Sequence, residues 1–284
     1  MRRCARWCLI AASLAVWIPR SLAAQETDDP HQVQPERPTV ATHAYTVWPG
    51  WVELEAGFEL DRFDAGVHAA STPLALKIGV APRVQVELQD AWVRNTDVGP
   101  ARDGGGDLSL GVKWRLADHL PVIGSFAILP AIKFPTGSLR QGTGTGTTDA
   151  RITLISSNQL GPVELDINAG YTRRSSAAHV PRNGTLWTVS GGVPVAGPFG
   201  WTAEVYGYPG TGGAGGSAPI VALLAGPTLS VRRWLACDLG AIVPIRGPQP
   251  RAVYAGGTWN IGQLWSSRAA RSRGTSVSAP SRPR

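Results

Sequence analysis

The chain has 284 residues, 43% of them hydrophobic and 17% charged, and this composition excludes an intrinsically disordered protein. No run of about 18 apolar residues follows residue 24, which excludes a transmembrane helix in the mature chain. The formal net charge of +7 includes nine arginines within residues 1–24 and 265–284. Without them, 18 Lys and Arg residues stand against 20 Asp and Glu residues. Because the remaining chain has no excess of positive charge, no nucleic-acid partner is expected.

The first 24 residues have the parts of a secretory signal peptide. Three arginines precede an apolar stretch from Trp7 to Ile18, and the small residues Ser21 and Ala23 suit a cleavage site. A membrane anchor is the alternative, and the shortness of the apolar stretch disfavours it. Residues 25–48 are polar and contain prolines, so we expect an extended periplasmic lead-in rather than a domain.

From residue 49 onward, apolar and polar residues alternate. Residues 107–116 are the clearest case, because every second residue from Leu108 to Leu116 is apolar and the intervening ones are charged or small. Successive side chains of a β-strand point to opposite faces, so such a segment predicts a strand with one apolar face. Twelve segments are predicted as strands, although 219–231 is apolar on both faces in its first half: 52–61, 74–80, 84–89, 107–116, 122–134, 150–159, 163–172, 185–195, 199–208, 219–231, 235–245 and 252–261.

The connections between these segments alternate in length. Those after even-numbered strands are tight, as at 81–82 and 160–162, whereas those after odd-numbered strands are longer and polar, as at 95–106 and 135–149. Short periplasmic turns opposite long extracellular loops are typical of outer-membrane barrels with an even strand number. We therefore predict an all-β fold over residues 49–264: a transmembrane antiparallel β-barrel of about 12 strands in an up-and-down meander, in the outer membrane of a Gram-negative bacterium.

The placement of charges and tryptophans favours this barrel over a soluble β-sandwich, which shows the same alternation. Charges of both signs share one face, which suits a polar lumen where they can pair, and tryptophans stand at strand ends, where interfacial aromatics lie. The predicted lumen-lining residues are Glu53, Glu55, Glu59, Lys77, Arg83, Glu87, Asp107, Lys113, Arg115, Lys133, Arg151, Glu164, Asp166 and Glu204. The predicted interfacial aromatics are Trp51, Trp92, Trp187, Trp201 and Trp234.

Four short motifs occur in order along the predicted barrel. They are PGWVELEAGF at 49–58, IGVAPRVQVEL at 78–88, GDLSLGVK at 106–113 and FPTGS at 134–138. Together they resemble the landmarks of the outer-membrane transporter family associated with the meta-pathway of phenol degradation, over most of residues 49–262. The resemblance implies an outer-membrane barrel that passes aromatic or other small hydrophobic compounds, and it brings no catalytic residues.

The last predicted strand carries a second resemblance. Tyr254, Gly256, Trp259 and Ile261 are similar to the C-terminal signal by which barrel proteins are handed to their assembly machinery. Barrels usually end soon after this signal, whereas here a Ser/Arg/Pro-rich tail, residues 265–284, continues and is expected to be disordered.

No catalytic, metal or cofactor site is indicated. The five histidines lack metal-ligand spacing, the glycines of 142–146 are not followed by the Lys-Ser/Thr of a phosphate loop, and no G-x-S-x-G occurs. Glu53 and Glu55 share a strand face, and we favour a structural charge network with Lys77 over a reactive pair, because unpaired charges in a narrow lumen are costly. We therefore expect no enzyme and no cofactor.

Three functions are compatible with these observations. The favoured one is a monomeric barrel for passive passage of small hydrophobic or aromatic solutes, with outer-membrane lipid and the barrel-assembly machinery as its other partners. A non-transporting structural or surface-interaction barrel is the second, and a lumen plugged by fully paired charges would favour it. An outer-membrane lipid-modifying enzyme is the third; it would need a Ser or His with a partner at the lipid-facing rim, and the sequence shows none.

Overall fold

The computed structural model describes residues 29–62, 68–95, 102–176, 181–209 and 218–266. The predicted signal peptide and most of the predicted C-terminal tail lie outside the described residues. All regular elements of the described chain are strands: β1 (Trp51–Arg62), β2 (His68–Ala81), β3 (Val84–Asn95), β4 (Arg102–Gly105), β5 (Ser109–Leu120), β6 (Gly124–Lys133), β7 (Asp149–Leu160), β8 (Val163–Arg174), β9 (Asn183–Ala196), β10 (Phe199–Tyr208), β11 (Ile220–Arg232), β12 (Leu235–Arg246) and β13 (Arg251–Gln263). Among the described residues no helix is long and apolar enough to cross a membrane.

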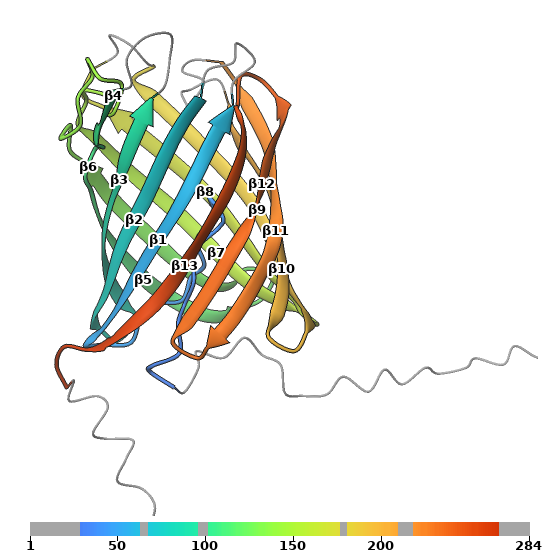
Figure 1. Cartoon of the computed structure of the whole chain (residues 1–284). Coiled ribbons are helices and arrows are strands. Elements are labelled where there is room, and N and C mark those ends of the chain that lie inside the picture. The colour runs from blue at the N-terminus through green and yellow to red at the C-terminus, as the bar shows by residue number, and fades with distance from the viewer. Residues whose placement is uncertain (1–28, 63–67, 96–101, 177–180, 210–217, 267–284) are drawn as a thin grey trace, which may run out of the picture.

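Twelve of these strands form a closed antiparallel wall (Figure 1). Consecutive strands pair with one another, β3 pairs with β5, and the ring closes where β1 pairs with β13. The remaining strand, β4, pairs only with the end of β3 and belongs to the connection between β3 and β5. The predicted antiparallel barrel of about 12 strands is confirmed, and the short β4 is an addition within one predicted loop.

The two faces of the wall are the reverse of those of a soluble protein. Phe58 and Trp114 on the outer face are 48% and 51% exposed, whereas Glu53 and Lys113 on the inner face are 0% exposed. Large apolar side chains are normally buried and charged ones exposed. A closed wall with an apolar exterior and a polar interior is the arrangement of an outer-membrane barrel, because lipid replaces water outside.

One end of the barrel carries the tight turns. The turn between β2 and β3 places Arg83 at a φ of 65°, and the turns at Gly161 and Gly197 have φ values of 62° and 54°. Positive φ in a short hairpin matches the twist of the flanking strands. The prediction that Arg83 lines the lumen is therefore wrong: it is a turn residue whose half-exposed side chain pairs with Asp118 at the barrel rim.

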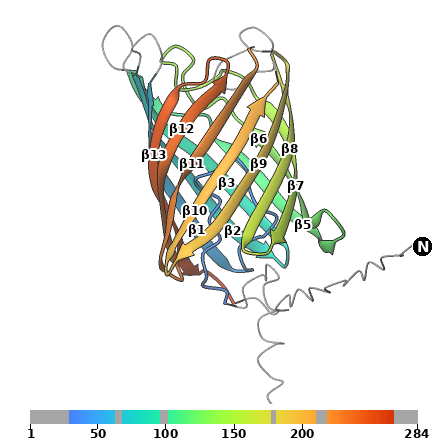
Figure 2. The ribbon, with the colours of Figure 1, turned by 90° about the vertical axis from the view of Figure 1, so that its right-hand side faces the viewer.

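The chain before β1 lies inside the barrel (Figure 2). We call residues 29–50 the inner segment. The sequence placed residues 25–48 outside the barrel as a periplasmic lead-in, and for the described part, 29–48, this expectation is wrong. The physical reason is that an extended, proline-bearing stretch leaves its backbone N–H groups unpaired, and the polar inner face of the wall supplies acceptors for them.

Candidate functional site

The inner segment enters the lumen at the short-turn end. The Asp29 carboxylate pairs with Arg233 in the β11–β12 turn at 3.2 Å, and the Val33 N–H donates to the Arg233 carbonyl at 2.8 Å. On the neighbouring strand, the side-chain amide of Asn260 donates to the Pro30 carbonyl at 3.1 Å. These contacts fix the entry point of the segment beside β11, β12 and β13.

At mid-barrel the inner segment is held by side chains of β8 and β10. The two oxygens of the Glu204 carboxylate accept hydrogen bonds from the backbone N–H groups of Val40, at 2.7 Å, and Ala41, at 2.6 Å. Asn168 then makes a reciprocal pair with Thr42, accepting from its N–H at 2.8 Å and donating to its carbonyl at 2.9 Å. One carboxylate and one amide thus satisfy four polar groups of the segment's backbone.

The segment returns to the short-turn end along the opposite wall. The Ala44 N–H donates to the Ser157 hydroxyl at 2.7 Å, and the Val47 N–H donates to the Gln85 side chain at 2.7 Å. The Gly50 N–H bonds the carbonyl of Gly79 at 2.7 Å. A side chain at Gly79 would collide with the Val47 and Trp48 carbonyls, so the close approach of the two backbones depends on this glycine.

Five of the fourteen predicted lumen residues, two buried lysines and three carboxylates, meet in ion pairs. Lys77 lies 3.1 Å from Glu53 and 2.9 Å from Glu55, and Lys113 lies 3.6 Å from Glu87. The inner segment adds a further carboxylate to this network, because Glu36 pairs with Lys113. We call these side chains the lysine network. Its pairing gives Glu53 and Glu55 a structural partner, in line with the charge network that the sequence favoured over a reactive pair.

Other predicted lumen residues lie outside the lysine network. Arg115 pairs with Asp118 at 3.4 Å and stands over the ring of Tyr45, 5.8 Å from its centroid. Lys133 pairs with Asp107 at 2.8 Å and with Asp149 at 3.4 Å, at the long-loop end of the wall. Glu59, Arg151, Glu164 and Asp166 share the parity of the buried inner-face positions on their strands, and the structure does not bring them into one cluster.

Asp107 ends the connection from β4 and ties together two long loops. Burial disfavours its charged form, but hydrogen bonds from Lys133 and from the backbone and hydroxyl of Thr145 outweigh that effect and lower its pKa. Its second oxygen accepts from the Gly137 N–H at 3.1 Å. Asp107 therefore fixes the 134–148 loop to the rim of the barrel while it is ionised.

A cavity of about 760 Å³ lies between the inner segment and the lower parts of β7–β12. Turn residues such as Pro162 and Gly197 line it at the short-turn end, and Thr39 of the inner segment lines it farther inside. Glu164 and Asp166 are on its wall. The lower lumen is thus part filled by the segment and part open.

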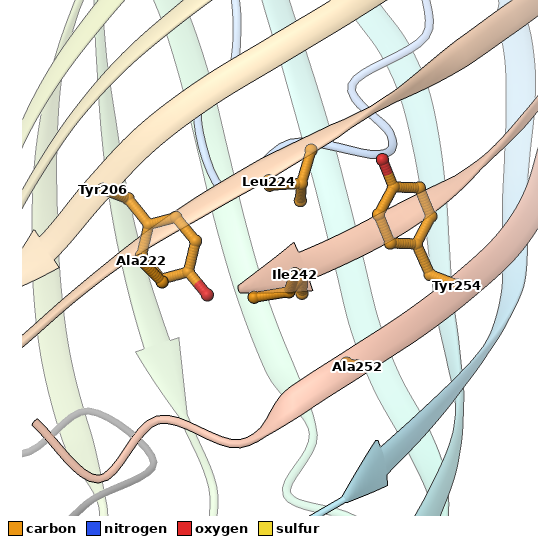
Figure 3. Packing of buried hydrophobic residues seen from close by; sticks show 6 residues of the cluster. All are labelled: Tyr206, Ala222, Leu224, Ile242, Ala252 and Tyr254. Carbon is orange, nitrogen blue, oxygen red and sulfur yellow. The ribbon is translucent and has the colours of Figure 1, made fainter. Parts of the chain in front are cut away.

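One side of the upper lumen has an apolar wall. Tyr206, Ala222, Leu224, Ile242, Ala252 and Tyr254 project from the inner face of β10, β11, β12 and β13 and pack together, each 5% exposed or less (Figure 3). We call these six residues the apolar patch. Val40, from the turn of the inner segment that Glu204 holds, packs against it, as does Tyr208. The Tyr254 hydroxyl has no hydrogen-bond partner among the described residues.

Sequence reasoning missed both the inner segment and the apolar patch. One signal for the patch was present: residues 219–231 are apolar on both faces in their first half, which means that an apolar side chain also points inward there. The inner segment had no comparable signal, because a polar, proline-bearing stretch has the same composition inside a polar lumen as in solvent.

The predicted interfacial tryptophans lie near strand ends. Trp92, Trp187, Trp201 and Trp234 are 53%, 36%, 46% and 37% exposed, respectively. Trp51 differs, because its ring packs against that of His31, with the ring centroids 5.1 Å apart, where the inner segment enters. In the predicted assembly signal, Trp259 and Ile261 face outward and Tyr254 faces inward as part of the apolar patch.

Comparison with known proteins gives a family and a fold. The family model described as "MetA-pathway of phenol degradation" matches residues 38–231. No curated protein sequence matches the chain. An outer membrane channel from Pseudomonas putida F1 aligns at 10% identity with a TM-score of 0.62, over 76% of this chain and 97% of the other. The NanC porin aligns at 11% identity with a TM-score of 0.52, over 74% of this chain and 98% of the other. At such low identity these likenesses show the outer-membrane barrel fold alone.

Proposed function

This chain belongs to the phenol-degradation family just described, and on that premise we propose that it is an outer-membrane channel for passive passage of small hydrophobic or aromatic solutes. The observation that carries the proposal is the apolar patch on the inner wall. Passage of water and ions alone would not require three adjacent strands that point Leu, Ile and Ala side chains into the lumen. The channel named in the Pseudomonas putida F1 structure has the same fold, which supports a conduit.

The apolar patch suits an aromatic solute in shape and polarity. Two tyrosine rings, Tyr206 and Tyr254, flank Leu224 and Ile242, so an aromatic ring could stack or pack edge-to-face while its apolar surface is buried (Figure 3). The unpaired Tyr254 hydroxyl would accept from or donate to a phenolic hydroxyl. A buried hydroxyl without a partner costs about 1–3 kcal/mol, so a solute that pairs with it gains part of that energy.

Passage requires the inner segment to move, because Val40 covers the apolar patch. The turn that carries Val40 is held at mid-barrel by the Glu204 carboxylate. When residues 39–42 separate from Glu204 and Asn168, the patch becomes available and joins the cavity below. The inner segment is then the barrier of the channel, and Glu204 is the main contact that keeps it in place.

The test is solute uptake into liposomes that contain the full-length protein. Phenol is expected to enter faster than a sugar, and Ile242→Asn should reduce this preference because it places an amide in the patch. Leu129→Asn is the matched control, since Leu129 is a buried inward-facing residue of β6 outside the patch. Absence of flux for every small solute would refute the channel and leave the barrel fold intact.

A non-transporting barrel is the second candidate, and the filled lower lumen favours it. The lysine network pairs four carboxylates with two buried lysines, and the inner segment supplies one of these carboxylates, Glu36. On this alternative the segment never leaves the lumen, and the long loops carry the function. A Glu204→Gln protein that still passes no solute and keeps its segment protected would support this alternative.

The remaining expectations about the setting complete the proposal. Residues 1–24 direct export, residues 254–261 are recognised by the barrel-assembly machinery, and the barrel acts as a monomer with the short turns in the periplasm. We propose no enzymatic activity and no cofactor.

A further inference from the structure

Two arginines stand opposite each other on the outer face at the long-loop end. Arg62 is the last residue of β1, Arg251 is the first residue of β13, and the antiparallel register pairs them directly. Both side chains are exposed. The upper ends of β1 and β13 lie side by side at the front of the barrel in Figure 1.

The pair marks the upper edge of the lipid-facing surface. The next outward residues below it, Leu60 and Val253, are also directly opposite each other and are 44% and 56% exposed. Below them the same face continues with Phe58 and Ala255. Because apolar residues on this face contact acyl chains, the two guanidinium groups lie at the height of the outer-leaflet headgroups.

The two positive charges have no anion within the described chain. Like charges directly opposite on one sheet face repel each other. Neither arginine makes an ion pair or a side-chain hydrogen bond with any residue that the structure describes. Arg94, an outward arginine at the same end of β3, differs because Asp103 of β4 stands opposite it in the strand register.

We propose that Arg62 and Arg251 bind a phosphate group of a phosphorylated, multiply acylated glycolipid in the outer leaflet. The side chains of directly opposite residues start from Cα atoms about 4.5–5.5 Å apart, so both guanidinium groups can reach one phosphate. Guanidinium matches phosphate through paired N–H donors. The exposed Leu60 and Val253 beneath suit the acyl chains of the same molecule, which free phosphate lacks.

This inference goes beyond solute passage and does not depend on it. It requires only that the long-loop end faces outward, and a barrel that passes no solute would still carry the site. Uptake of phenol into vesicles without glycolipid is therefore expected to be the same for the wild type and for variants of the arginine pair.

The test is native mass spectrometry of the full-length protein in detergent with three probes: diphosphoryl lipid A, dephosphorylated lipid A and inorganic phosphate. The wild type should bind the diphosphoryl form at least tenfold more tightly than the dephosphorylated form. Arg62→Gln/Arg251→Gln should lose this difference. Arg140→Gln/Arg182→Gln removes the same charge from two other exposed loop positions at this end and should retain it.

Several outcomes would overturn the proposal. They are unchanged lipid A binding by the Arg62→Gln/Arg251→Gln protein, an equal loss in the control, or full displacement of lipid A by millimolar inorganic phosphate. Heat-modifiability on a gel checks that each variant is a folded barrel. If the double variant does not fold, Arg251→Gln alone must lower lipid A affinity at least threefold for the proposal to stand.

Discussion

The hold of Glu204 on the inner segment gives a sharp prediction for Glu204→Gln. The carboxylate accepts from two backbone N–H groups at once, those of Val40 and Ala41, and it is 1% exposed. The amide of Gln has one acceptor oxygen, and its NH₂ group would face a backbone donor. The substitution therefore removes one charge-assisted hydrogen bond and leaves a buried N–H without an acceptor.

The magnitude follows from this geometry. A hydrogen bond to a charged group contributes about 1.5–3 kcal/mol. Since about 1.4 kcal/mol is a tenfold change in an equilibrium constant, the population with a displaced segment should rise roughly tenfold to a hundredfold. Hydrogen exchange at the amides of residues 39–42 should speed up by this factor, and conductance across a planar bilayer should rise with it.

Glu164→Gln is the matched control for this change. Glu164 points into the cavity from β8, and its carboxylate accepts no hydrogen bond within the described residues. The same chemical substitution there should leave both readouts unchanged. Unaltered exchange at residues 39–42 in Glu204→Gln, or an equal effect of Glu164→Gln, would show that the carboxylate does not hold the segment.

Three further predictions concern the wall and its rim. Leu110→Arg places a charge on the lipid-facing side and should cost about 2–4 kcal/mol near the bilayer midplane. Urea refolding into lipid measures this cost, and unchanged stability would contradict the assignment of Leu110 to the outer face. Lys77→Met leaves the carboxylates beside it without a cation and should destabilise the barrel by about 3–5 kcal/mol. The loss would be measured as a lower heat-modification temperature. Unchanged stability would refute the contribution of the lysine network to the stability of the barrel. Hydrogen bonds outweigh burial and lower the pKa of Asp107, so they stabilise its loop above the unfolded pKa of about 4, and this stabilisation is lost as pH falls through the lower folded value. Proteolysis of the 134–148 loop should therefore accelerate in acid. In Asp107→Asn, whose loop is already released, acid should not accelerate proteolysis.

The sequence predicted the wall well because one physical rule governs it. Lipid on one side and polar groups on the other impose a period of two, so the outward Leu110 and the inward Lys113 could be assigned from parity alone. The alternation of short turns with long loops distinguished the two ends of the barrel. The rule failed at Arg83, which has the parity of the inward residues of β3 but lies one residue before that strand, in a turn where its own φ is positive.

The contents of the lumen could not be predicted in the same way. Parity states that a residue faces inward, but not what it meets there. Glu204 was assigned to the lumen, yet its partners are backbone N–H groups more than 160 residues earlier in the chain, and backbone donors leave no pattern in a sequence. The pairing of Glu53 and Glu55 with Lys77 was expected because all three side chains belong to neighbouring strands.

The lower and upper halves of the lumen hold the inner segment in different ways, and this difference bears on the proposed passage of solutes. In the lower half, polar wall groups bind the inner segment, and a segment held by hydrogen bonds and ion pairs can leave only if water or ions replace those partners. In the upper half, the side of the wall from β10 to β13 is apolar, and Val40 is the residue of the segment that packs against it. An aromatic solute arriving from outside would compete with Val40 for the apolar patch and would bind better to the state in which the segment has withdrawn. A ligand that prefers one of two states shifts their populations by the ratio of its affinities, so the solute itself would favour the open channel.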